Sequence, residues 1–100
     1  MVKHIVMWKF CDSAQGQSKE ENMAKVKDML FALLDIIPQI KSMDIGFDIT
    51  HSEMSMDLVL LTEFDSVEDM KTYANHPEHL KVSKFVRSVI ESRRVIDYNV

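Results

Sequence analysis

The stretch VKHIVMWKFC at residues 2–11 is rich in β-branched and aromatic residues, and this composition predicts a β-strand. Successive side chains of a strand point to opposite faces, so Val6 and Trp8 share one face and Ile5 and Met7 share the other. Both faces are therefore apolar, and both must be covered in the folded protein. We expect a central strand of a sheet.

A helix is predicted to follow this strand. Ser18 and Glu21 have the spacing of a capping box, in which two side chains satisfy free backbone amides at a helix start. Apolar residues then recur at helical spacing from Met23 to Ile37, which predicts a helix of roughly 20 residues. Pro38 should end it, because proline lacks a backbone donor and clashes with the preceding turn.

Two further strands are predicted in the middle of the chain. Residues 41–50 alternate between apolar and polar side chains, which is typical of an edge strand with one solvated side. Residues 51–55 are polar and should form a turn. Residues 56–64 repeat the two-sided apolar pattern of residues 2–11, so they predict a second central strand.

Two helices and a last strand are predicted for the C-terminal part. Ser66 and Asp69 repeat the capping spacing and predict a short helix. Pro77 suits the first turn of a second helix, whose apolar positions continue at helical spacing to Ile90. Residues 93–100 should form the final strand.

The order of these elements predicts an α+β fold, namely a ferredoxin-like β-α-β-β-α-β subunit in which residues 1–100 form a single domain. Topology rules place the first and third strands in the middle of the sheet and the other two at its edges. The helices can cover only one face, and the other face is more apolar than a soluble monomer usually leaves bare. We therefore expect a homodimer that pairs through its sheet faces.

Charge and composition restrict the partners. The net charge is −4 and the pI is near 5.5, with scattered Lys and Arg, which argues against nucleic-acid and anionic-membrane partners. We find neither a signal peptide nor an apolar run near the roughly 20 residues that cross a bilayer. The only cysteine, Cys11, excludes an internal disulfide and fits a reducing compartment, so we expect a cytoplasmic protein.

The segment YANHPEH at residues 73–79 contains the densest cluster of protonatable side chains. Tyr73 and His79 lie on different predicted helices, so the break at Pro77 could bring a phenol and an imidazole together. An imidazole can accept a proton near neutral pH, and a phenol can donate a hydrogen bond to a developing oxyanion. His4 shares a strand face with Trp8 and adds to this set. The alternative is structural: Tyr73 packs in the core, and the histidines cap helices or pack against the sheet.

Metal and cofactor sites are not expected. The spacing of His76, Glu78 and His79 differs from the two-histidine helical zinc motif, and no cysteine pair supplies further ligands. A glycine-rich phosphate loop is also missing, which argues against nucleotide chemistry.

Seven short segments together carry a family resemblance. They are VKHIV at 2–6, IGFD at 45–48, DLVL at 57–60, Phe64, Tyr73, HPEH at 76–79 and VIDY at 95–98. Through them the chain resembles the stress-responsive A/B barrel (Dabb) proteins nearly from end to end. The resemblance implies a ferredoxin-like subunit that dimerises through its sheets into a dimeric α/β barrel.

The resemblance also suggests where chemistry takes place. Many Dabb proteins have no assigned reaction, but the chain is similar to plant polyketide cyclases of the olivetolic acid cyclase type, which close a ring by aldol chemistry without a cofactor. A histidine and a tyrosine act in the cleft of those enzymes. They match His79 and Tyr73 here, and His4 matches a strand histidine nearby.

Two hypotheses for function follow. In the first, the protein binds or transforms a small apolar carbonyl compound, with His79 as proton acceptor and Tyr73 orienting the oxygen. In the second, it is a non-catalytic stress-response or structural dimer module, and both residues only pack helix against sheet. The sequence alone leaves open whether this protein is an enzyme.

Overall fold

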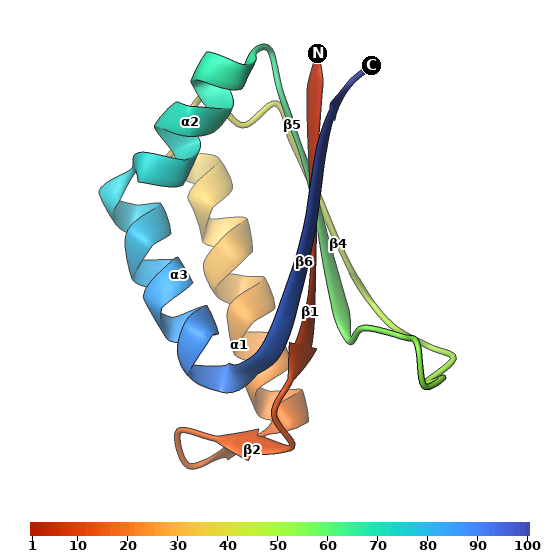
Figure 1. Cartoon of the computed structure of the whole chain (residues 1–100). Helices are drawn as coiled ribbons and strands as arrows, with labels where there is room; N and C mark the ends of the chain where they lie inside the picture. The colour runs from red at the N-terminus through yellow and green to blue at the C-terminus, as the bar shows by residue number, and fades with distance from the viewer.

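Helices cover one face of a four-stranded antiparallel sheet in the computed structural model, which describes residues 1–100 (Figure 1). The sheet consists of β1 (Val2–Phe10), β4 (Ser42–Phe47), β5 (Leu58–Phe64) and β6 (Ile90–Asn99). The helices are α1 (Lys19–Ala32), the 3-10 turn η1 (Leu33–Asp35), α2 (Val67–Asn75) and α3 (Pro77–Val89). The predicted α+β ferredoxin-like fold is confirmed. None of the helices is both long and apolar enough to cross a membrane.

The strand order is β4-β5-β1-β6, so β1 and β5 are the central strands. This agrees with the two-sided apolar pattern of both segments. The chain termini lie side by side at one end of β1 and β6, because Val2 pairs with Asn99 (Figure 1).

The core lies between the sheet and the helices. Val6 and Phe10 of β1 and Leu60 of β5 are each about 1% exposed, and they pack in one cluster with helix residues such as Val26 and Val86. Burial of such apolar side chains stabilises the fold by roughly 1.5–3 kcal/mol each. The even-numbered face of β1 is therefore the helix-facing side of the sheet.

The opposite face of the sheet is uncovered in the single chain. The strand register aligns Ile5 with Leu61 and Ile96, and Met7 with Val59, so an apolar row crosses three strands. Ile96 is 57% exposed. We call this surface the open sheet face.

Each of the three α-helices begins with a side-chain cap, and the sequence predicted those of α1 and α2. The Ser18 hydroxyl accepts from the Glu21 amide, and Glu21 accepts from the Ser18 amide, so the capping box is complete. Ser66 caps α2. His76 caps α3, because its Nδ1 accepts from the Glu78 amide at 3.1 Å. His76 therefore serves as a cap.

Several predicted boundaries were wrong. The first helix ends at Ala32, six residues before Pro38, and the 3-10 turn η1 follows it to Asp35. Ile90 was expected in the last helix, but its extended backbone begins β6, so α3 leads into the strand without a loop. A hairpin of β2 (Ser13–Ala14) and β3 (Gln17–Ser18) was missed. Its turn residues Gln15 and Gly16 have φ of 53° and 74°, as a two-residue type I′ turn requires.

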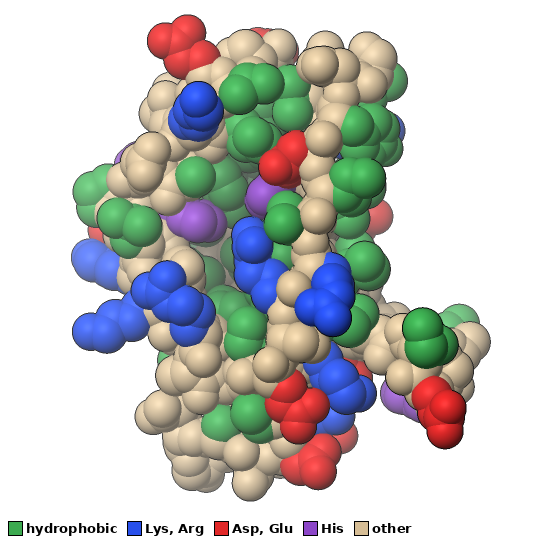
Figure 2. Space-filling model, viewed as in Figure 1, with side chains coloured by type: hydrophobic (Ala, Val, Ile, Leu, Met, Phe, Trp, Pro, Cys, Tyr) green, Lys and Arg blue, Asp and Glu red, His purple; other side chains and the backbone are tan.

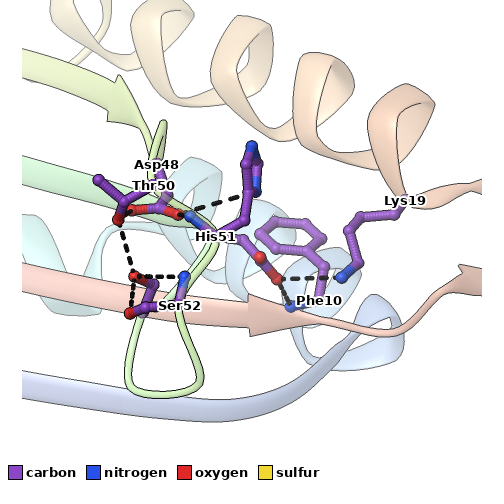
Figure 3. A network of polar contacts seen from close by, with 8 residues as sticks. Phe10, Lys19, Asp48, Thr50, His51 and Ser52 are labelled. Carbon is purple, nitrogen blue, oxygen red and sulfur yellow. Dashed lines mark hydrogen bonds and ion pairs between the residues drawn. The ribbon is translucent and has the colours of Figure 1, made fainter.

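Asp57 has a structural role that the sequence did not reveal; Figure 3 labels its partners Phe10 and Lys19. Its carboxylate accepts from the Phe10 amide at 2.7 Å and lies 3.5 Å from the Lys19 ammonium. Its own amide donates to the Trp8 carbonyl. Asp57 thus ties the start of β5 to the end of β1 and the start of α1.

Candidate functional site

A cavity of about 60 Å³ lies between α3 and the β1–β6 half of the sheet. Its apolar lining includes Val6, Trp8, Leu60, Val82, Val86 and Ile90. Its polar lining comprises His4, Tyr73, His79, Ser83, Arg87 and Arg93. Figure 2 shows the corresponding hollow between α3 and β6, with His side chains and, nearer the C-terminal end of α3, Lys and Arg side chains around it.

The size of the cavity limits what it can enclose. Sites that bury a drug-sized ligand have volumes of roughly 300–1,000 Å³, so about 60 Å³ accommodates only a small group such as a carbonyl or a short alkyl end. Arg87 and Arg93 are exposed residues on the lining, so the cavity reaches the surface between α3 and β6. A larger ligand would extend outward through this mouth.

Tyr73, in the last turns of α2, is held deep in the site. The residue is 1% exposed, and its ring packs 5.1 Å from the Phe64 ring. Its hydroxyl is buried and has no hydrogen-bond partner. Burial raises the pKa of Tyr73 to about 12, although the charge of Arg93 acts in the opposite direction. The phenol is therefore protonated at neutral pH and can donate a hydrogen bond.

His79 lies in the first turn of α3, with its ring centroid 4.4 Å from that of Tyr73. Its Nδ1 lies 3.0 Å from the Ala74 carbonyl oxygen. Because a carbonyl only accepts, Nδ1 must carry the proton, and in the neutral ring Nε2 keeps a free lone pair. Burial lowers the pKa of His79 below its usual 6.5, although the hydrogen bond to the Ala74 carbonyl acts in the opposite direction. The charges of nearby His4, Arg93 and His76 lower it further. The ring is therefore a free base at neutral pH.

His4 enters the site from β1. Its ring centroid is 6.3 Å from that of Tyr73, and its Nδ1 is hydrogen-bonded to the carboxylate of Asp97 on β6. The two residues are partners in the β1–β6 register. Because a carboxylate accepts, Nδ1 of His4 carries a proton, and Asp97 fixes the orientation of the ring.

The structure thus brings together the three residues that the sequence suggested, His79, Tyr73 and His4. Sequence reasoning assigned no role in the site to Asp97 or Arg93. Asp97 was part of the VIDY segment, but only the register of β6 against β1 places it beside His4. Arg93 was the expected start of a strand, and its place on the cavity depends on the same register.

The comparisons with known proteins agree with this architecture. The model of the family described as the stress responsive A/B barrel domain, Dabb, matches residues 2–100. The chain belongs to the Dabb family. It is 31% identical over 99 residues to olivetolic acid cyclase of Cannabis sativa, an alignment that covers 97% of this chain and 94% of that protein. It is 29% identical to the Dabb protein DABB1 of Arabidopsis thaliana, covering 98% of this chain but 46% of that protein.

The solved structures that this Dabb chain resembles include dimeric ferredoxin-like proteins. A dimeric protein of unknown function from Bacteroides fragilis has a TM-score of 0.88 and 34% identity, covering 99% of this chain and 95% of that one. A hydroxynitrile lyase from Passiflora edulis has a TM-score of 0.80 and 21% identity, covering 97% of this chain and 90% of that one. At that identity the likeness to the lyase shows the fold alone.

Proposed function

We propose that this Dabb protein binds a small, largely apolar carbonyl compound between α3 and β6 and transfers a proton at the carbon next to the carbonyl, without a cofactor. The observation that carries the proposal is the Tyr73 hydroxyl, which is buried and unpartnered on a ring whose centroid lies 4.4 Å from that of His79. Leaving a buried donor unsatisfied costs roughly 1–3 kcal/mol. A ligand oxygen would satisfy it.

The geometry supports a two-residue mechanism. Nε2 of His79 accepts a proton from the carbon next to the carbonyl, and the C–H electron pair forms the enolate double bond while the carbonyl π pair moves to oxygen. The Tyr73 hydroxyl donates a hydrogen bond to that developing oxyanion, in a site of low polarity where such a bond is most effective. The nucleophilic enolate carbon can then attack a second carbonyl of the same molecule or recover the proton.

His4 and Asp97 have a supporting role in this proposal. The aspartate holds the His4 ring in one orientation beside Tyr73. Because Nδ1 is bonded to Asp97, Nε2 is the ring nitrogen of His4 that remains free on the cavity lining. The similarity to olivetolic acid cyclase along nearly the whole chain supports an enzyme that acts on a small molecule.

The test uses 2-octanone, a neutral apolar methyl ketone, dissolved in D2O with catalytic amounts of protein. Proton NMR measures the rate at which the hydrogens next to the carbonyl exchange for deuterium. We expect His79→Gln to lower the enzymatic rate by about 10²–10⁴-fold, the usual contribution of a general base. Tyr73→Phe should lower it by about 10²–10³-fold.

Matched controls exist within the chain. His51→Gln changes a histidine whose side chain is 79% exposed in the β4–β5 loop, and Tyr98→Phe changes the other tyrosine. Neither should alter exchange. Exchange no faster than in buffer, or equal rates in wild type and His79→Gln, would contradict the proposal.

The structural alternative predicts a different stability for the Tyr73→Phe variant. If the Tyr73 hydroxyl has a structural partner in the folded protein, removing it should lower the free energy of unfolding. If the hydroxyl awaits a ligand, Tyr73→Phe should raise that free energy by about 1 kcal/mol, because an unsatisfied buried donor is removed. Urea unfolding of the ligand-free protein distinguishes these outcomes.

We further propose that two copies pair through the open sheet face. Its row of Ile5, Leu61 and Ile96 supplies apolar area that only a partner can cover. The dimeric ferredoxin-like protein of Bacteroides fragilis, at 34% identity, supports a homodimer.

A further inference from the structure

The proposed reaction uses one end of the cavity, and two arginines line the other end. Arg87 comes from α3 and Arg93 from β6. Every ion pair of the structure uses lysine or histidine as its cation, so both guanidinium groups lack a carboxylate partner. Two unpaired cations beside one cavity contrast with the chain's net charge of −4.

The two ends of the cavity are separated along both walls. His79, Ser83 and Arg87 recur at four-residue intervals, so they follow one edge of α3, and eight residues of helix span about 12 Å. On β6, the four residue steps from Arg93 to Asp97 span about 13 Å. Asp97 of β6 pairs with His4, and Arg93 pairs with Trp8. The strand wall and the α3 wall therefore both lead from the histidine end of the cavity to the arginine end.

The charges of the two ends differ in sign. Asp97 places a carboxylate beside His4, and the cations Arg87 and Arg93 come from backbone positions about two turns along α3 and four residues along β6 away from that end. The lining between them is apolar, including Val82, Val86 and Ile90. A ligand with an anionic group would therefore be oriented, since that group is repelled by Asp97 and attracted by the arginines.

We infer that the ligand is an apolar molecule with a carbonyl at one end and a carboxylate at the other, and that Arg93 and Arg87 bind the carboxylate. The inference rests on the proposed function, because it takes the carbonyl to lie at Tyr73 and His79. A guanidinium matches a carboxylate with two parallel N–H donors, a geometry that a lysine lacks. The effect of Arg93 on the pKa values of Tyr73 and His79 indicates that its charge acts within this cavity.

The experiment compares 7-oxooctanoate with 2-octanone, which has the same methyl ketone end and a methyl group in place of the carboxylate. Isothermal titration calorimetry measures both affinities at low ionic strength. We expect the keto acid to bind about tenfold more tightly than the ketone. This factor is at the lower end of the range for hydrogen bonds to a charged group, because both arginines are reached by water. Arg93→Gln should abolish most of this preference.

Arg94→Gln is the matched control. Arg94 is the next residue of β6 and pairs with Met7 on the open sheet face, so its charge lies on the other side of the strand. Its removal should leave the preference intact. Salt provides a second readout: raising sodium chloride from roughly 0.05 to 0.5 M should weaken binding of the keto acid but not of the ketone.

The outcomes separate this inference from the proposed function. Equal affinity of the two compounds, or equal loss of preference in Arg93→Gln and Arg94→Gln, would overturn the inference even if 2-octanone exchanges its hydrogens. Arg93-dependent binding of octanoate, which has no ketone, would support the carboxylate site even if exchange failed. In that case only the proposed reaction would be wrong.

Discussion

At the scale of single residues, burial gives His79 and Tyr73 complementary chemistry. The imidazole is neutral because burial lowers its pKa, and the phenol is neutral because burial raises its pKa to about 12. One residue can therefore accept a proton while the other donates a hydrogen bond at the same pH. Free side chains in water would share this behaviour only over a narrower pH range.

The lowered pKa of His79 predicts a pH dependence of stability. Well above pH 6.5 the ring is neutral in both the folded and the unfolded chain, so it contributes no pH dependence to the free energy of unfolding. As pH falls below 6.5, the unfolded chain takes up the proton first, and the free energy of unfolding decreases until pH passes the lower folded pKa. Urea unfolding across this range should show a smaller decrease for His79→Gln than for wild type.

His51→Gln provides the comparison for this titration, since its side chain is 79% exposed. A difference between wild type and His79→Gln that stays constant with pH would contradict the assignment. NMR titration of the imidazole Cε1–H signals should place the pKa of His79 below 6.5.

At the scale of elements, Asp57 joins three segments that are distant in sequence. It binds the Phe10 amide at the end of β1 and approaches Lys19 at the start of α1, while β5 begins at the next residue (Figure 3). Its side chain is only 14% exposed. Removing an acceptor at such a place leaves a backbone donor without a partner.

We predict that Asp57→Ala lowers the free energy of unfolding by about 1.5–3 kcal/mol, the usual effect of losing a hydrogen bond to a charged group. Asp57→Asn should cost less, because its side-chain oxygen can still accept from Phe10. Asp28→Ala, at an exposed position of α1, should change stability by no more than about 0.5 kcal/mol. Equal effects of Asp57→Ala and Asp28→Ala in urea unfolding would contradict the assigned role.

At the scale of the whole molecule, the two faces of the sheet have different tasks. The helix-facing side contains the core and the cavity, and the open sheet face carries the apolar row through Ile5, Leu61 and Ile96. Pairing through the open face would leave the mouth of the cavity, between α3 and β6, free on each copy. A dimer would then have two independent sites.

Light scattering at micromolar concentration tests the pairing. We expect a mass near twice 11.6 kDa for the wild type and near 11.6 kDa for Ile96→Glu, which places a charge in the apolar row. Leu80→Glu, at an exposed position on α3, should remain a dimer. A monomeric wild type would overturn pairing through this face.

The sequence determined the order and kind of the main elements because local periodicity and capping express them directly. The two-sided apolar runs of β1 and β5 identified the central strands, and the capping box of Ser18 and Glu21 identified the start of α1. Tyr73 and His79 were predicted as a pair from the density of protonatable side chains in residues 73–79, and His4 was added from its place on a strand face. Local patterns could not locate the end of α3, since Ile90 satisfies both the helical period and the strand that follows.

Only the tertiary structure decided which side chains meet. The pairing of His4 with Asp97, the place of Arg93 on the cavity and the contact of Asp57 with Phe10 all depend on strand register and on packing between segments far apart in sequence. A shift of one residue in β6 would move Asp97 and Arg93 to the open sheet face, because side chains alternate along a strand. Register is set by the packing of the whole sheet, so no local pattern in the sequence contains it.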